Sequence, residues 1–265
     1  MERGLWSEGH QVMDFYDHNT ITDETKLTND QAIFWLCHKL GIELPFLGAN
    51  PSCHQTCINA GPGKVGPNHE YYGLMRHAYH QASCSLMRTT SARHDAVLEA
   101  FDKYLKRYLH LTSNLGEFLQ KDEGSNKSTD ILVGYPNQAW RRSMSGDYTC
   151  ICPFLTRYHA KAVDDFRAMI EGRAEEKVGR HAEWCDKTHN RDFLAIPGTT
   201  LGSIGGDDFW EWYDGIWDKA ARDEVAAGGS RHELDRHKQD LLAMAHAIII
   251  RYTTNHIIAL SGRIH

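Results

Sequence analysis

Apolar and polar residues recur at the helical period along most of the chain, most clearly in residues 154–172. Charged residues cover one face of that segment, which is typical of a helix packed on a core. The opposite face carries Leu155, His159, Ala162, Val163, Phe166 and Ile170. We therefore expect His159 to point inward. A buried imidazole needs a partner at each nitrogen, so His159 is either a hydrogen-bonded core residue or a metal ligand.

The same period and the local capping signals predict further helices, separated by polar segments rich in Gly, Pro and Asn. The segment 131–152 is interpreted as irregular, and 191–206 as a segment that ends in a Gly-rich loop. The pattern therefore predicts one all-α domain over residues 1–265, in which residues 1–28 form an arm that could pack on a neighbouring subunit. The predicted helices are 28–40, 70–88, 93–120, 154–172, 209–217 and 231–260.

Polar side chains form a stripe on the predicted helix 70–88. His69, Gly73, His77, His80 and Cys84 follow one another at steps of three or four residues, which places them on one face of a helix. A polar stripe on an otherwise apolar helix indicates either the wall of a cavity or a hydrated helix interface.

Two further patterns are candidates for ligand binding. Arg141 and Arg142 lie in the segment 131–152, and a guanidinium can grip a substrate carboxylate with two parallel hydrogen bonds; the alternative is a solvated pair. His181, Cys185 and His189 follow one another at intervals of four residues. On a helix they would share one face, and zinc can bind ligands with this spacing. Incidental histidines at an exposed helix end are the alternative there.

Composition and charge narrow the class of protein. The chain has 265 residues, of which 41% are hydrophobic and 24% charged, and its net charge is -6. That balance is typical of a globular domain and disfavours a nucleic-acid partner. Neither a membrane-spanning run nor a signal peptide is expected, so the prediction is a cytoplasmic protein. The 7 cysteines are irregularly spaced, and reduced thiols are therefore expected.

Three motifs together resemble the haem-dependent aromatic oxygenase superfamily, which includes the tryptophan 2,3-dioxygenases. Residues 157–163, Arg-Tyr-His-Ala-Lys-Ala-Val, are similar to the proximal helix of that family. Residues 68–70, Asn-His-Glu, resemble its distal His-Asp-Glu motif, shifted by one position. Residues 198–203, Gly-Thr-Thr-Leu-Gly-Ser, are similar to its Gly-Thr-Gly-Gly loop. The resemblance covers roughly residues 65–205, in the order of the family.

The resemblance implies a helical bundle around haem b, with His159 as the axial ligand of the iron. It further implies that Gly198, Thr199 and Thr200 close over haem and substrate. A thioether link to haem is not predicted, although His80 and Cys84 have the spacing of one. His246 and His256 are alternative axial ligands. The expected distal and substrate-binding residues are His69, His54, His77, Tyr72, Thr200, Arg141 and Arg142.

The implied function is insertion of oxygen, from O2 or peroxide, into the ring of an aromatic amino acid in bacterial secondary metabolism, as in antibiotic biosynthesis. Tryptophan or a methylated tryptophan is favoured, and a tyrosine 3-hydroxylase is the alternative within the family. Two alternatives come from other classes. One is a zinc-dependent hydrolase that uses His181, Cys185 and His189, and the other is a helical interaction module without catalysis.

Overall fold

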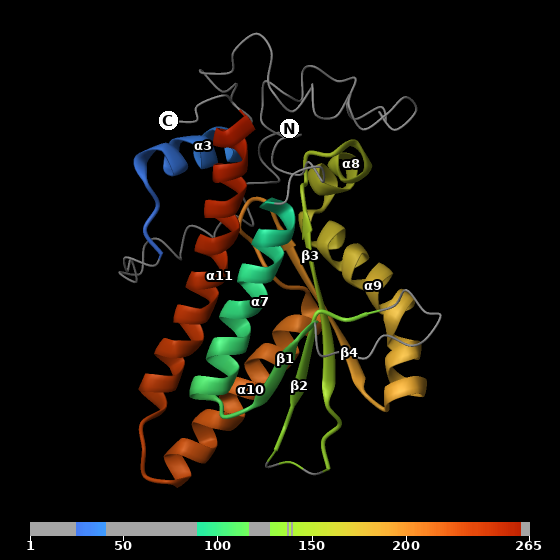
Figure 1. Cartoon of the computed structure of the whole chain (residues 1–265), viewed down its shortest axis with the longest axis vertical. Helices are drawn as coiled ribbons and strands as arrows, with labels where there is room; N and C mark the ends of the chain where they lie inside the picture. The colour runs from blue at the N-terminus through green and yellow to red at the C-terminus, as the bar shows by residue number, and fades with distance from the viewer. Residues whose placement is uncertain (1–24, 41–88, 117–127, 137, 139, 261–265) are drawn as a thin grey trace.

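The computed structural model describes residues 25–40, 89–116, 128–136, 138 and 140–260. These residues form six helices and a four-stranded mixed sheet (Figure 1). The prediction of an all-α bundle is therefore wrong. The error lies in the segment 131–152, which was expected to be irregular, and in 191–206, of which only the Gly-rich end was interpreted; together they supply three of the strands.

The sheet has the order β1-β2-β3-β4. Its strands are β1 (Thr112–Leu115), β2 (Ile131–Gly134), β3 (Met144–Ile151) and β4 (Asp192–Thr199). The pairs β1/β2 and β2/β3 are antiparallel, whereas β3 and β4 are parallel. Parallel neighbours need a long crossover connection, and here α8 (Thr156–Asp164) and α9 (Phe166–His189) provide it.

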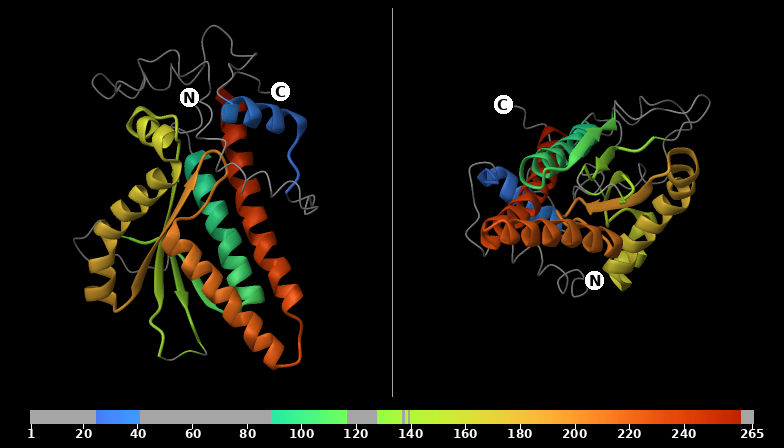
Figure 2. Two further views of the ribbon diagram at one scale, coloured as in Figure 1. Left: turned by 180° about the vertical axis from the view of Figure 1, so that it is seen from behind. Right: turned by 90° about the horizontal axis from the view of Figure 1, so that it is seen from below.

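Helices cover both faces of the sheet. Successive side chains of β3 and β4 point to opposite faces, so each of these strands contacts helices on both sides. Tyr148 and Ile196 point into the main core, whereas Asp147 and Phe193 point to α9 and contact Lys177 and His181. Figure 2 shows α9 on one side of the strands and the other long helices on the opposite side. Those helices are α7 (Thr89–Tyr108), α10 (Asp207–Ala226) and α11 (Arg231–Leu260).

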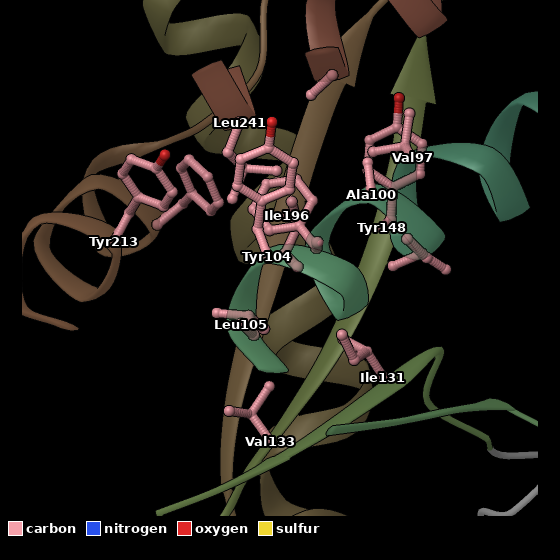
Figure 3. Close-up of a cluster of buried hydrophobic side chains, with 14 of the residues drawn as sticks. Val97, Ala100, Tyr104, Leu105, Ile131, Val133, Tyr148, Ile196, Tyr213 and Leu241 are labelled. Atoms are coloured by element: carbon pink, nitrogen blue, oxygen red, sulfur yellow. The ribbon is translucent and has the colours of Figure 1, made fainter. Parts of the chain in front are cut away.

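The main core lies between the sheet and these three helices (Figure 3). Phe101 of α7 meets the rings of Phe209 and Tyr213 edge to face, at 6.0 and 6.4 Å between centroids. The Tyr213 hydroxyl donates to the carbonyl oxygen of Lys238 and so ties α10 to α11. Phe209, Tyr213 and Trp217 of α10 and Leu241 of α11 are buried in this core.

The predicted helix 93–120 is too long. α7 ends at Tyr108, and His110 has φ 51, a left-handed conformation that ends a helix. The amide of Leu111 then donates to the carbonyl oxygen of Leu105. From Thr112 the chain continues as β1, so the apolar residues beyond Tyr108 that looked helical belong to a loop and a strand.

The predicted helix 154–172 is two helices. Asp165 is extended, with φ -150 and ψ 102, and its side chain accepts a hydrogen bond of 2.8 Å from the amide of Ala168. Aspartate is a favoured N-cap, so Asp165 ends α8 and starts α9. The apolar period continues across this break, and for that reason the period alone did not reveal it.

The remaining helix ends follow the capping signals in the sequence. In α3 (Asn29–Leu40), the Gln31 amide donates to the Thr28 hydroxyl, and the Thr28 amide donates to the Gln31 side chain. This pair is a capping box. Between α10 and α11, Gly228 has φ 90, a conformation that glycine adopts without strain. Both predicted boundaries, near Thr28 and at Arg231, are confirmed.

None of the helices that the structure describes is long and apolar enough to cross a lipid bilayer.

Candidate active site

The second half of β3 has an edge that no described strand covers. β2 pairs only with residues up to Gly146. Beyond that point the Asp130 carboxylate takes the place of a strand, because it accepts a hydrogen bond of 2.8 Å from the amide of Tyr148. The amide of Asp130 in turn donates to the carbonyl oxygen of Gly146. This edge thus exposes backbone and side-chain polar groups between α7 and α9.

His94 of α7 is held between two carboxylates at this edge. Its Nε2 lies 2.9 Å from Asp130 Oδ2 and its Nδ1 lies 3.0 Å from Asp95 Oδ1. Burial disfavours the imidazolium, but the hydrogen bonds and charges of Asp130 and Asp95 outweigh it and raise the pKa of His94 to about 9. His94 is therefore a cation at neutral pH.

Asp147 of β3 is the most buried carboxylate of the cluster. Burial, followed by the negative charge of Asp130, raises the pKa of Asp147 to about 6, against the opposing effect of Lys177. Both Asp147 oxygens lie 2.9 Å from Lys177 Nζ, and Oδ2 lies 3.3 Å from His181 Nε2. Asp147 is thus poised to gain or lose a proton close to neutral pH.

Asp130 joins the two halves of the cluster. Burial alone would raise its pKa, yet the hydrogen bonds from His94, Asp147 and the Tyr148 amide bring it below its ordinary value. Below pH about 6 the proton of this carboxyl pair therefore resides on Asp147, while Asp130 stays ionised beside the His94 cation.

A cavity of about 580 Å³ opens onto this cluster. Cationic groups gather on its α9 side, where Lys177 and Arg180 lie one turn apart. The carboxylates lie on the β3 side. The lining residues are His94, Ser128, Asp130, Asp147, Tyr148, Lys177, Arg180 and His181. A site with acid, base and cationic groups around one hollow suits proton transfer on a small polar molecule.

The structure separates the residues that were expected to form a haem site. His159 is half-buried on α8, beyond the carboxyl end of β3, and the sheltered residues of α8 include Ala162 and Tyr158. Arg141 and Arg142 precede the amino end of β3. A strand of eight residues spans roughly 26 Å at about 3.3 Å per residue, so His159 and this arginine pair lie at opposite ends of the sheet.

Both arginines are engaged with other parts of the protein. The Arg141 guanidinium lies over the Tyr135 ring, 4.0 Å from its centroid. Arg142 pairs with Asp186 at 2.7 Å and with Asp192 at 3.6 Å. The pair therefore fixes the start of β3 against the end of α9, and it does not face the cavity beside Asp147.

The predicted Gly-Thr-Thr loop lies at the end of β4. Gly198 and Thr199 belong to the strand and pair with Cys150 and Ile151. Thr200 is fully buried, and its hydroxyl lies 3.1 Å from His38 Nε2. These side chains face the protein interior, whereas the resemblance placed them over a substrate.

The distal part of the predicted haem site, namely His54, His69, Tyr72 and His77, lies outside the described residues, as do residues 1–24 of the expected arm and the His80 and Cys84 pair. The described part does not fit the predicted arrangement, because His159, the arginine pair and the buried Thr200 do not converge. We therefore derive no reaction step through haem, and His159 as an axial ligand stays a prediction.

Absorption spectroscopy tests that prediction directly. If His159 binds haem, protein expressed with a haem precursor shows a Soret band that shifts when carbon monoxide is added to the reduced form. His159→Ala then removes the band, while His232→Ala, at an exposed position of α11, leaves it in place. A wild-type protein without a Soret band would rule out the haem.

The zinc hypothesis rested on His181, Cys185 and His189, which do lie on one helix, α9. His181 stacks on Phe193 and pairs with Asp147, Cys185 is buried, and His189 meets the Trp184 ring edge to face. In the described part of the chain, no three His, Cys, Asp or Glu side chains are grouped so that they could hold a metal ion.

The alternative axial ligands His246 and His256 are both buried on α11. Burial lowers the pKa of His246 to about 4, and burial together with the charge of Arg93 lowers that of His38 to about 3. His246 and His38 are therefore neutral in the folded protein down to acid pH. Both pack in the interior in this neutral form, and His38 contacts the Thr200 hydroxyl.

These two histidines predict acid instability. Their folded-state pKa values lie below 6.5, so the unfolded chain binds protons first and stability falls as pH drops below about 6.5. Each histidine is expected to remove roughly 2 kcal/mol of unfolding free energy between pH 6.5 and 5. Urea titrations at both pH values check this. His246→Asn should flatten the slope, and an unchanged slope would contradict the assignment.

Comparisons of the chain with protein-family models, curated proteins and solved structures gave no match.

Sequence reasoning missed His94, Asp130, Asp147 and Lys177. Two signals were present. Lys177 and His181 stand four residues apart on one helical face, and Asp147 is a carboxylate inside a strand that is otherwise free of charge. The contacts between His94 and Asp130 and between Asp147 and Lys177 span 36 and 30 residues, so no local pattern could pair them.

Proposed function

We propose that the chain is a hydrolase that acts by general acid–base catalysis on a small polar ester bound in the cavity beside Asp147. The observation that carries this proposal is the chain of contacts from His94 through Asp130 to Asp147, whose two ends have pKa values of about 9 and about 6. Both environments raise the pKa, so that near neutral pH Asp147 is a carboxylate basic enough to accept a proton while His94 still carries one to donate.

Asp147 is the general base in this proposal. With a pKa of about 6 it is ionised at neutral pH and still basic enough to take a proton from water. The water oxygen then attacks the electrophilic centre of the ester. Lys177, which contacts both Asp147 oxygens, fixes the carboxylate and offers a positive charge near the negative charge that develops in the transition state.

His94 is the general acid. Asp130 holds Nε2, so the Nδ1 proton is the one to be transferred. Its present acceptor, Asp95, is exposed, and an exposed ion pair is easily replaced by a substrate oxygen. The Nδ1 proton passes to the leaving-group oxygen as the ester bond breaks. Asp147 then releases the water proton to solvent, and His94 takes up a proton from solvent, which restores both groups. Both protons are thereby accounted for.

The test uses chromogenic p-nitrophenyl esters, with acetate and phosphate as the first two acyl groups. The wild-type chain is expected to release p-nitrophenol from at least one of them, and Asp147→Asn to lower the rate strongly, because an amide cannot accept the water proton. Asp223→Asn, at an exposed carboxylate of α10, is the matched control. A rate that is the same in Asp147→Asn and wild type would overturn the proposal.

A further inference from the structure

A second cavity, of about 370 Å³, adjoins the first, and His94 and Tyr148 line both. It lies where α7 begins, above the second half of β3. Its lining residues are Thr90, Ser91, Arg93, His94, Asp95, Tyr148, Thr149 and Cys150. A group bound here is within reach of a reaction centre in the first cavity, because the same imidazole borders both.

The lining favours an anion. Thr90 and Ser91 of the first turn of α7, a helix of 20 residues, line the cavity, and a helix amino terminus carries partial positive charge. Arg93 adds a guanidinium that is only 4% exposed. Asp95 is the one carboxylate among the lining residues, and the His94 imidazolium beside it offsets part of its charge.

Tyr148 gives an independent indication of a ligand. The residue is 2% exposed, and its hydroxyl makes no hydrogen bond to oxygen or nitrogen in the part of the chain described. Figure 3 shows this hydroxyl pointing along β3 toward the carboxyl end of the strand, where Thr149 and Cys150 line the cavity. Burial raises the pKa of Tyr148 well above its ordinary value, and Cys150 adds to the effect, so the hydroxyl is a permanent donor. The acceptor closest at hand is the Cys150 sulfur, which accepts only weakly, so an anionic ligand oxygen would give this buried donor a much better partner.

We infer that this second cavity binds the phosphate group of a phosphorylated substrate, held by the first turn of α7, Arg93 and the Tyr148 hydroxyl. The inference rests on the proposed function for the reaction itself, since it names the class of substrate on which His94 and Asp147 act. Phosphate has several terminal oxygens, and it therefore suits a site whose donors come from a helix terminus, a guanidinium and a phenol at once.

Binding of inorganic phosphate to the full chain tests this inference without any turnover, by isothermal titration calorimetry at 0.15 M sodium chloride. Tyr148→Phe is expected to weaken binding about 10-fold, because it removes one hydrogen bond to a charged oxygen. The fold should tolerate this change, since the hydroxyl leaves behind only the Cys150 thiol, a weak hydrogen-bonding group that can stay unpaired at little cost. Tyr135→Phe is the matched control, as Tyr135 is buried and its hydroxyl accepts from Trp212 instead.

Two outcomes would overturn the inference: no phosphate binding by the wild type, or equal affinity in wild type and Tyr148→Phe. Ester turnover is measured separately, so the two proposals can fail independently. Phosphate binding with no turnover of any ester would leave the anion site standing and remove the hydrolase. Turnover of p-nitrophenyl acetate without phosphate binding would do the reverse.

Discussion

Replacing His94 by glutamine is expected to lower the turnover of an ester with an alkyl alcohol as leaving group by about 10²- to 10⁴-fold, the usual contribution of a positioned general acid. The glutamine amide can still donate a hydrogen bond to Asp130 and so replace the bond of 2.9 Å that His94 Nε2 makes there. What it cannot do is give a proton to the leaving group. His232→Gln changes an exposed histidine of α11 and should leave the rate unchanged.

The pH dependence of the rate distinguishes this role from a structural one. Asp147 must be ionised, so the wild-type rate rises through pH about 6, and His94 must be protonated, so the rate falls through pH about 9. In His94→Gln the alkaline limb should disappear while the acid limb remains. A variant that loses activity yet keeps both limbs would show that His94 only supports the fold.

The helices could be predicted from the sequence where their ends carry local signals. Thr28 with Gln31 forms a capping box, and Gly228 turns the chain before α11. Such signals act over three or four residues and are visible in a single sequence. Asp165 is a signal of the same kind, but it sits inside an uninterrupted apolar period, and the period concealed the break between α8 and α9.

The strands could not be predicted in the same way, because β3 is buried along most of its length. Its sequence, Met-Ser-Gly-Asp-Tyr-Thr-Cys-Ile, is sheltered by α9 on one side and by the main core on the other. Strands covered on both faces lose the alternation that marks a half-exposed strand. Residues 131–152 therefore looked irregular, and the all-α prediction followed from that gap.

The candidate site could not be predicted either, because its residues are brought together by the pairing of strands that the sequence did not reveal. Asp130 and Asp147 come together only because β2 pairs with β3 in one register, with Ile131 opposite Gly146. A shift by one residue would turn Asp147 to the other face of the sheet. Motif similarity pointed instead to His159, on the neighbouring helix α8, which shows that a short motif carries little without its structural setting.

Replacing Phe101 by alanine is expected to lower the free energy of unfolding by about 3 to 5 kcal/mol, the range for a buried phenylalanine. Phe101 is 1% exposed and contacts the rings of Phe209 and Tyr213, so it joins α7 to α10. Removing the ring leaves a cavity between α7 and α10. Other large side chains hold these helices apart, so the helices cannot move together to fill it.

Urea unfolding followed by circular dichroism measures the change, with Trp140→Ala as the control. Trp140 is 81% exposed, so its removal should alter the unfolding free energy by no more than about 0.5 kcal/mol. Equal losses in the two variants would contradict the packing of α7 on α10. That result would also weaken the candidate site, because the same packing holds α7, and with it His94, against the open edge of β3.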